Sequence, residues 1–241
     1  MFQRKWILAT LLVFAGTALC IRLGIWQLDR LEQRRAFNHQ VESMRAMPVL
    51  DLNEQQPEDI ASMEWRSVEV TGEYDFTEQV ALRNQYYLDQ YGYHLLTPLL
   101  YNGTAVLVDR GWIPADGNST PADWRKYDES GEVHLVGQIR LGQTKPAFGG
   151  VADALPASGE RLDVWNNADI THIAGQMPYP ILTVYLQPNV NAEDTEPPIP
   201  YQPALELTEG PHAGYAGQWF IFATILFFGY PFFLRKQEAA T

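Results

Sequence analysis

Two apolar runs, one near each end of the printed sequence, constrain this chain more than any other feature. Residues 6–21 (WILATLLVFAGTALCI) and 213–234 (AGYAGQWFIFATILFFGYPFFL) are almost free of charged side chains, whereas the segment between them is polar. A helix rises about 1.5 Å per residue, so the second run can cross a hydrocarbon core of about 30 Å. The first run reaches that length when residues 23–26 extend it past Arg22, whose long side chain can reach the headgroups. We therefore predict two membrane spans.

A signal peptide is the alternative interpretation of the first run. Arg4 and Lys5 form a basic start, and the residues TALC resemble a lipoprotein cleavage box. Leu19 argues against cleavage, because a large residue directly before Cys20 fits a peptidase poorly and the apolar stretch continues beyond the cysteine. We favour an anchor that stays in the chain.

Charge divides the chain in the same way. Residues 36–212 contain 26 Asp and Glu against 9 Lys and Arg, and the whole chain has a net charge of −12. Nucleic acids bind to basic surfaces, so this class of partner is excluded. The lone Cys20 excludes an intramolecular disulfide and a thiolate cluster for zinc or iron–sulfur binding.

Topology follows from the two spans. They place both termini on one side of the membrane, and the basic residues beside the termini (Arg4, Lys5, Arg235, Lys236) favour the cytoplasmic side, although Arg22, Arg30, Arg34 and Arg35 oppose this preference. Long loops cross a membrane largely regardless of their charge. We therefore expect the middle of the chain to be exoplasmic.

The middle of the chain has the pattern of short β-strands. Six segments rich in β-branched and aromatic residues are separated by turn signals: 65–75, 79–87, 93–100, 104–113, 132–141 and 181–188. Because no long helical crossovers connect them, we predict an antiparallel sheet, closed as a barrel or stacked as a sandwich. Short helices are expected at PADWRKYDE and ADITHIAGQM, the first with Pro121 in its first turn.

The fold class is thus an α+β membrane protein, with a hairpin of two transmembrane helices flanking an antiparallel β-rich domain. The predicted parts are a cytoplasmic N-terminus (1–5), transmembrane helix 1 (6–26), its extension out of the membrane (27–47), the β-rich domain (48–190), a proline-rich acidic connector (191–211), transmembrane helix 2 (212–234) and a cytoplasmic C-terminus (235–241).

His212 is the one candidate for chemistry that the spacing singles out. His212, Tyr215 and Trp219 share one helix face at the start of the second span. One interpretation is a hydrated interfacial histidine beside an aromatic belt. The other is an axial ligand to haem iron, since a helix N-terminus disfavours the imidazolium and keeps a nitrogen free for the metal.

Residues on the first span could complete such a site. Gln27, Arg30 and Arg34 share a face beyond Gly24, and guanidinium groups can grip a pair of propionates. Binding of these arginines to lipid phosphates or to acidic residues of the domain is equally compatible with their positions. Small residues every four positions favour close packing of the spans, at Gly16, Cys20 and Gly24 on the first and at Ala213 and Gly217 on the second.

The remaining residues indicate no catalytic site. His39, His94, His134 and His172 are scattered without the spacing of metal ligands, and phosphate loops, nucleophile elbows and zinc-protease motifs are absent from the sequence. We therefore expect a binding protein and not an enzyme.

Four stretches, in this order, resemble the Surfeit locus protein one family of cytochrome c oxidase assembly factors. They are LGIWQLDR (23–30), YHLLTPL (93–99), VLVDRGWIP (106–114) and PHAGYAGQWF (211–220). The family pattern before the second span reads Asn-x-His-x-x-Tyr, and Gly210 replaces the Asn here, which puts an orienting hydrogen bond in doubt. The resemblance to bacterial members implies a two-pass protein of the inner membrane with a periplasmic middle domain.

The resemblance also implies a function, namely binding of haem a and its insertion into subunit I of the oxidase. The expected partners are cytochrome c oxidase subunit I, proteins of haem a synthesis or oxidase assembly, and membrane lipid. On this hypothesis haem a lies between the two spans, with His212 bound to the iron, the aromatic rings against the macrocycle, and Arg30 or Arg34 at the propionates. The residues assigned to this site are His212, Tyr215, Trp219, Gln218, Trp26, Gln27, Arg30 and Arg34. The alternative is a membrane-anchored scaffold that stabilises an oxidase intermediate without binding haem.

Overall fold

The computed structural model describes residues 6–146, 149–154, 160–191, 193–200 and 205–239. The predicted N-terminus (1–5), the last two residues of the predicted C-terminus (240–241), and residues 192 and 201–204 of the predicted connector lie outside this range. The chain forms two compact units, one made of residues 1–40 with 205–241 and one made of residues 41–204. We describe each unit by itself.

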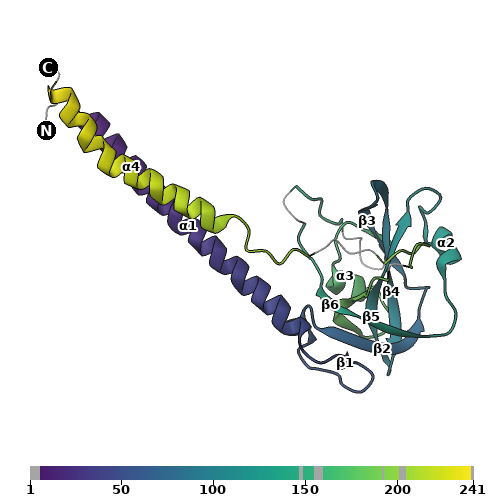
Figure 1. The fold of residues 1–241 in the computed structure, drawn as a ribbon. Coiled ribbons are helices and arrows are strands. Elements are labelled where there is room, and N and C mark those ends of the chain that lie inside the picture. Colours follow the sequence, from purple (N-terminus) through teal and green to yellow (C-terminus); the bar gives the residue numbers. More distant parts are fainter. Residues whose placement is uncertain (1–5, 147–148, 155–159, 192, 201–204, 240–241) are drawn as a thin grey trace. The chain divides into compact units, whose positions relative to one another are not determined.

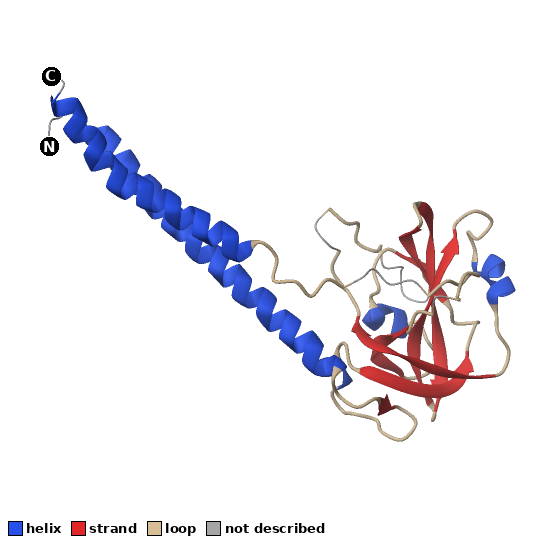
Figure 2. Ribbon diagram, in the orientation of Figure 1, coloured by secondary structure: helices blue, strands red, loops and turns tan. Residues whose placement is uncertain are grey.

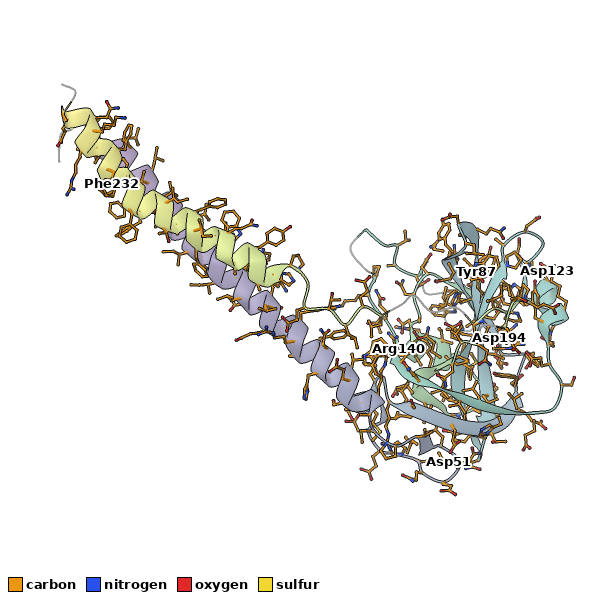
Figure 3. The ribbon with its side chains drawn as sticks, in the orientation of Figure 1. Asp51, Tyr87, Asp123, Arg140, Asp194 and Phe232 are labelled. Carbon is orange, nitrogen blue, oxygen red and sulfur yellow. The ribbon has the colours of Figure 1, made fainter. Side chains whose placement is uncertain are left out.

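The first unit is a pair of long helices, α1 (Ile7–Arg45) and α4 (His212–Ala239) (Figure 1). The last residues of α1, from Val41, belong to the second unit. The predicted first span and its extension form one uninterrupted helix, which ends shortly before Pro48, because no proline interrupts the run of good helix formers. Both helices are long and apolar enough to cross a membrane. Large apolar side chains project outward from them, among them the exposed Phe232 (Figure 3).

The two helices pack antiparallel, as successive contacts show. Residue numbers rise along α1 while those of their partners fall along α4. The contacts are Trp6 with Phe233 at 5.9 Å between ring centroids, Thr10 Oγ1 with the Tyr230 hydroxyl at 2.8 Å, and Phe14 with Phe227 at 6.4 Å between centroids.

Small residues of α1 line the helix contact, as predicted. A Cβ atom on Gly24 would come within 2.7 Å of the Phe220 ring, and Cys20 is buried. The prediction for α4 was wrong, because Ala213 is exposed and a Cβ on Gly217 would meet nothing within 4 Å. The buried small residues of α4 are instead Ala216 and Ala223. The spacing of small residues alone could not tell which side of α4 faces its neighbour.

The second unit is a β-rich domain with short helices (Figure 2). Its strands are β1 (Leu50–Asp51), β2 (Ser67–Tyr74), β3 (Val80–Tyr87), β4 (Gln90–Tyr101), β5 (Thr104–Pro114), β6 (Glu132–Leu141), β7 (Val164–Trp165) and β8 (Ile181–Pro188). All six predicted strands are present, and their ends agree to within three residues. The two-residue strands β1 and β7 were not predicted, since segments this short carry no periodicity.

Five strands close into a barrel in the order β2-β6-β8-β5-β4, with β4 returning to β2. The predicted fold class is therefore confirmed, with the barrel and not the sandwich. The expectation of a wholly antiparallel sheet was wrong, because β5 pairs with β8 in parallel, as do β1 with β2 and β3 with β7. The long chain segment between β6 and β8, which contains β7 and α3, lets β8 enter the sheet in the direction of β5.

The barrel encloses an aliphatic core that includes Val68, Val70, Leu99, Val106, Val108, Ile139 and Leu186.

The predicted short helices are present as α2 (Pro121–Trp124), continued by η3 (Arg125–Tyr127), and as α3 (Ile170–Ala174). Thr120 and Asp123 form a capping box around α2, with Pro121 in the first turn. An additional 3-10 helix, η2, spans Ile60–Met63.

Gly111 lies inside β5. Its φ of +119° and a bulge in the β4–β5 pairing let Trp112 pair with Ile199. A Cβ at Gly111 would lie 2.2 Å from the Ile199 carbonyl oxygen. Only glycine combines this backbone angle with so close an approach.

Candidate functional site

The structure joins two of the predicted site residues across the helix pair. His212 is the first residue of α4, and its Nδ1 lies 2.8 Å from Oε1 of Gln27 on α1. The ring is half-buried and directed toward the neighbouring helix. Of the residues assigned to the site from sequence, these two are joined by a hydrogen bond from one helix to the other.

Gln27 occupies the inner face of α1. The least exposed positions of this helix alternate at steps of three and four residues: Thr17, Cys20, Gly24, Gln27, Leu31, Arg34 and Asn38. This is the spacing of a helix that packs along a single seam. The seam therefore carries the Gln27 amide toward α4 and not toward the surrounding medium.

The second nitrogen of the His212 ring remains available. Within the described residues, Nε2 of His212 makes no hydrogen bond. Gly210 lies beside it with a φ of +68°, and a Cβ on Gly210 would lie 3.7 Å from Nε2 and 3.5 Å from Cδ2. Glycine at this position thus tolerates the left-handed backbone and leaves the approach to Nε2 open.

The aromatic residues lie round one flank of α4. Ala216 and Ala223 mark the line of contact with α1. At about 100° per residue, His212, Trp219 and Tyr215 lie about 40°, 60° and 100° from Ala216, all in the same direction. Trp219 is half-buried and meets Phe222 edge-on at 5.9 Å, while Tyr215 is 47% exposed and Gln218 is exposed. These rings border an open flank beside the histidine.

About two turns along α4 from His212, the Phe220 side chain fills the space beside α1. The Phe220 ring lies against Gly24, so a macrocycle cannot lie between the spans at this level without displacing the ring. The expected position of the haem between the two spans stays a prediction. The flank that carries Trp219 and Tyr215 is the place that the packing leaves open.

The predicted arginines have different surroundings. Arg34 donates from Nε to the Thr208 carbonyl at 3.0 Å and from Nη2 to the Glu206 carbonyl, so its fork binds the backbone that precedes α4. Arg30 is exposed, donates to Gln33 at 2.9 Å and lies 5.5 Å from the centroid of the exposed Trp26 ring. Of the two arginines, Arg30 has the more accessible guanidinium.

Sequence reasoning missed the residues that hold the chain onto α1 just before His212. Buried Asn38 donates to the Leu207 carbonyl at 3.1 Å, and exposed Arg35 forms a bidentate ion pair with Glu209 at 2.7 and 2.9 Å. Together with Arg34 they fix residues 206–209 along α1. The seven-residue spacing of Gly24, Leu31 and Asn38 was the available signal.

The β domain contains a second histidine in a buried hydrogen bond. Nδ1 of His94 on β4 lies 2.9 and 3.0 Å from the two carboxylate oxygens of Asp109 on β5. Both residues are buried. No group of three or more metal-ligating side chains occurs among the residues described in either unit.

An open polar groove of about 830 Å³ lies on the same domain. Buried Arg110 contributes to it and binds the Tyr127 carbonyl and Glu129, with the rings of Tyr74 and Phe76 within 5.2 and 4.9 Å of its guanidinium carbon. Much of the remaining lining is acidic or polar: Glu129, Asn189, Asn191, Glu193, Asp194, Thr195 and Glu196. The groove was not predicted, because its walls come from distant parts of the sequence.

The four sequence stretches that carry the family resemblance meet in two pairs. LGIWQLDR and PHAGYAGQWF meet through Gln27 and His212, and YHLLTPL and VLVDRGWIP meet through His94 and Asp109. Segments separated along the chain thus form two local centres, each built around an imidazole. Both centres lie within the region that comparison with known proteins covers.

Comparison with known proteins gives a consistent result. The sequence profile of the SURF1 family matches residues 14–224. Surfeit locus protein 1 of Xenopus tropicalis is 26% identical over 187 residues, which cover 70% of this chain and 57% of that protein. The SURF1-like protein of Rickettsia conorii is 24% identical over 234 residues, which cover 95% of this chain and 92% of that protein.

Human Surfeit locus protein 1 is 24% identical over 169 residues, and the match covers 54% of its length. The chain thus spans little more than half the length of the animal relatives that it matches. The profile match covers most of the chain and includes all four stretches described above. The chain belongs to the SURF1 family.

Proposed function

We propose that this protein assists the assembly of a haem–copper cytochrome c oxidase by holding haem a at His212 and passing it to subunit I. Membership in the SURF1 family and the likeness of its four motifs to oxidase assembly factors support the first part of this proposal. Other assembly proteins and enzymes of haem a synthesis are the expected suppliers of the cargo. Nothing in this function requires a covalent bond to be made or broken, so the role is binding and transfer.

The observation that carries the haem proposal is the arrangement around the imidazole. Nδ1 of His212 is held by Gln27 at 2.8 Å, and Nε2 faces the position that Gly210 leaves without a side chain. An imidazole with one nitrogen held and the other free is a usual ligand for haem iron. Haem a would supply the open coordination position that Nε2 fills.

The surroundings of His212 fit a flat apolar ligand. Trp219 and Tyr215 lie round the same flank of α4, where aromatic faces can pack against a macrocycle. Arg30 is the better candidate for the propionates, because Arg34 already binds two backbone carbonyls. Trp26 and Gln218, both exposed, would form the border of the site.

We propose that both helices cross the inner membrane of a bacterium, with the termini in the cytoplasm and the β domain in the periplasm. Two apolar helices support the two-pass arrangement. The similarity of nearly the whole chain to a rickettsial protein supports a bacterial membrane. The acidic domain between the spans is then on the outer side, where it can meet partner proteins.

Removal of the His212 imidazole tests the haem proposal. The full chain is purified in detergent from cells that make haem a, and the absorption spectra of the wild type and of His212→Ala are compared at equal protein concentration. We expect a haem spectrum in the wild type and a loss of at least tenfold in bound haem in the variant, because the iron loses its protein ligand.

His39→Ala is the matched control, since His39 is an exposed histidine on α1 of the same unit. It should retain wild-type haem content. A colourless wild-type protein, or a His212→Ala protein with an unchanged spectrum, would overturn the proposal.

A scaffold function is the second candidate, and the groove of the β domain favours it. Its volume of about 830 Å³ and its acidic lining suit a basic segment of a partner protein. The two functions differ in their dependence on His212. If His212→Ala supports normal oxidase levels in cells while groove variants do not, the scaffold is the correct function.

A further inference from the structure

We propose that Gln27 is a positioning residue that sets the tautomer and the orientation of His212. This inference rests on the proposed function for its meaning in haem binding, but its structural part can be measured without haem. On this inference Gln27, a residue of α1, controls how His212 of α4 can bind a metal. The contact between the two side chains carries the argument.

The polarity of this contact fixes the proton. Oε1 of an amide accepts hydrogen bonds and cannot donate them. With Oε1 as the amide atom that lies 2.8 Å from Nδ1, a neutral His212 ring that forms this hydrogen bond has its proton on Nδ1. The lone pair is then on Nε2, which is the nitrogen that faces Gly210.

Packing holds the Gln27 side chain in place. Gly24 and Leu31 lie one turn before and one turn after Gln27 on the same seam, and both are buried. The Phe220 ring rests on Gly24, which fixes the level of α4 relative to α1 close to this point. The side chains of Gln27 and His212 therefore meet at a point where both are carried by helices and not by a loop.

Gly210 strengthens the assignment. The residue has no side chain, so it cannot orient the imidazole that follows two positions later. Nor does any other described residue contact Nδ1 of His212 by a hydrogen bond. In this chain the orienting function thus falls to an acceptor on the opposite helix.

A hydrogen bond from Nδ1 to a fixed acceptor changes how strongly the imidazole binds a metal through Nε2. A ligating histidine whose other nitrogen donates to a fixed acceptor is restricted to one tautomer and becomes a stronger electron donor. Loss of an equivalent outer hydrogen bond typically lowers metal affinity about 10- to 100-fold. A stronger acceptor should act in the opposite direction on the electronic properties of the iron.

The first experiment measures the tautomer without haem. The full chain, labelled with ¹⁵N-histidine, is placed in detergent micelles, and the His212 signals are identified by their loss in His212→Ala. We expect a protonated Nδ1 and an unprotonated Nε2 in the wild type. Gln27→Leu should lose this preference, and Gln33→Leu, a matched change on the exposed side of α1, should retain it.

The second experiment measures haem binding by titration with haem a. Gln27→Leu should bind about 10- to 100-fold more weakly than the wild type. Gln27→Glu keeps an acceptor of similar reach, so it should recover much of the affinity while shifting the absorption bands and lowering the reduction potential. A purely structural role of Gln27 would not produce this spectroscopic and redox shift.

The outcomes separate this inference from the proposed function. A wild type that binds no haem overturns the haem proposal, and the ¹⁵N measurement still tests Gln27. If haem binding depends on His212 but Gln27→Leu and Gln27→Glu leave the tautomer, the affinity and the spectrum unchanged, the role of Gln27 is refuted.

Discussion

At the scale of single residues, two histidines show how surroundings decide what an imidazole does. Nδ1 of His212 lies beside the amide oxygen of Gln27 at the start of a long apolar helix, whereas His94 faces a carboxylate inside the β domain. Burial by itself would lower the pKa of His94. The Asp109 carboxylate, by its charge and its hydrogen bond, outweighs burial and raises that pKa above its ordinary value.

The His94–Asp109 pair predicts a pH dependence of stability. Because the folded state raises the pKa of His94, the stabilisation is complete below the unfolded value of about 6.5 and is lost as the pH rises through the folded value. Asp109→Asn should remove this decline and lower the free energy of unfolding by about 1–2 kcal/mol at pH 6, since a charged acceptor is replaced by a neutral one.

Urea unfolding of the full chain in detergent, followed by the fluorescence of the domain's tryptophans from pH 5 to 9, measures this effect. If the free energy of unfolding of Asp109→Asn falls with rising pH as that of the wild type does, a group other than His94 is responsible.

At the scale of elements, the level at which α1 and α4 meet depends on one close contact. Gly24 accommodates the Phe220 ring, and a Cβ there would lie 2.7 Å from it. The Gln27–His212 hydrogen bond lies one turn further along α1. Glycine thus fits position 24 because of the space that it leaves for the Phe220 ring.

Gly24→Leu should therefore separate the helices near the site. We expect a loss of about 1–3 kcal/mol from overpacking, together with weaker haem binding, because Gln27 no longer reaches His212. Thermal unfolding followed by circular dichroism and titration with haem a measure the two effects. Gly217→Leu is the control, since a Cβ there meets nothing within 4 Å and the residue lies away from the His212 flank. Equal losses in both variants would contradict this account.

At the scale of the whole molecule, the sequence separates into an acidic domain and two apolar helices of the same unit. Two spanning helices place the residues between them on one side of the membrane. On the exoplasmic side that we propose for it, an acidic domain suits contact with proteins more than with anionic lipid.

Labelling with a membrane-impermeant thiol reagent tests the proposed topology. Cys20→Ala removes the only cysteine, and single cysteines are then introduced at Ser130 or after Thr241. In right-side-out membrane vesicles, we expect rapid labelling at 130 and labelling after Thr241 only once the vesicles are opened. Labelling of both sites in sealed vesicles would exclude two complete spans.

Local patterns in the sequence were enough to predict the helices and strands, but not which element pairs or packs with which. Both long helices follow from apolar runs almost free of charge, and the six strands follow from short segments rich in β-branched and aromatic residues between turn signals. The same patterns gave no indication that β8 enters parallel to β5, or that Ala216 and not Ala213 faces α1.

The sequence by itself thus determined that this protein has two apolar helices flanking an acidic β-rich domain, and it pointed to His212. Only the tertiary structure decided that Gln27 contacts His212, that Arg34 binds backbone carbonyls and that the Phe220 ring lies against Gly24. The physical reason is that hydrophobic periodicity is a property of neighbouring residues, whereas a hydrogen bond across 185 positions depends on how two surfaces pack.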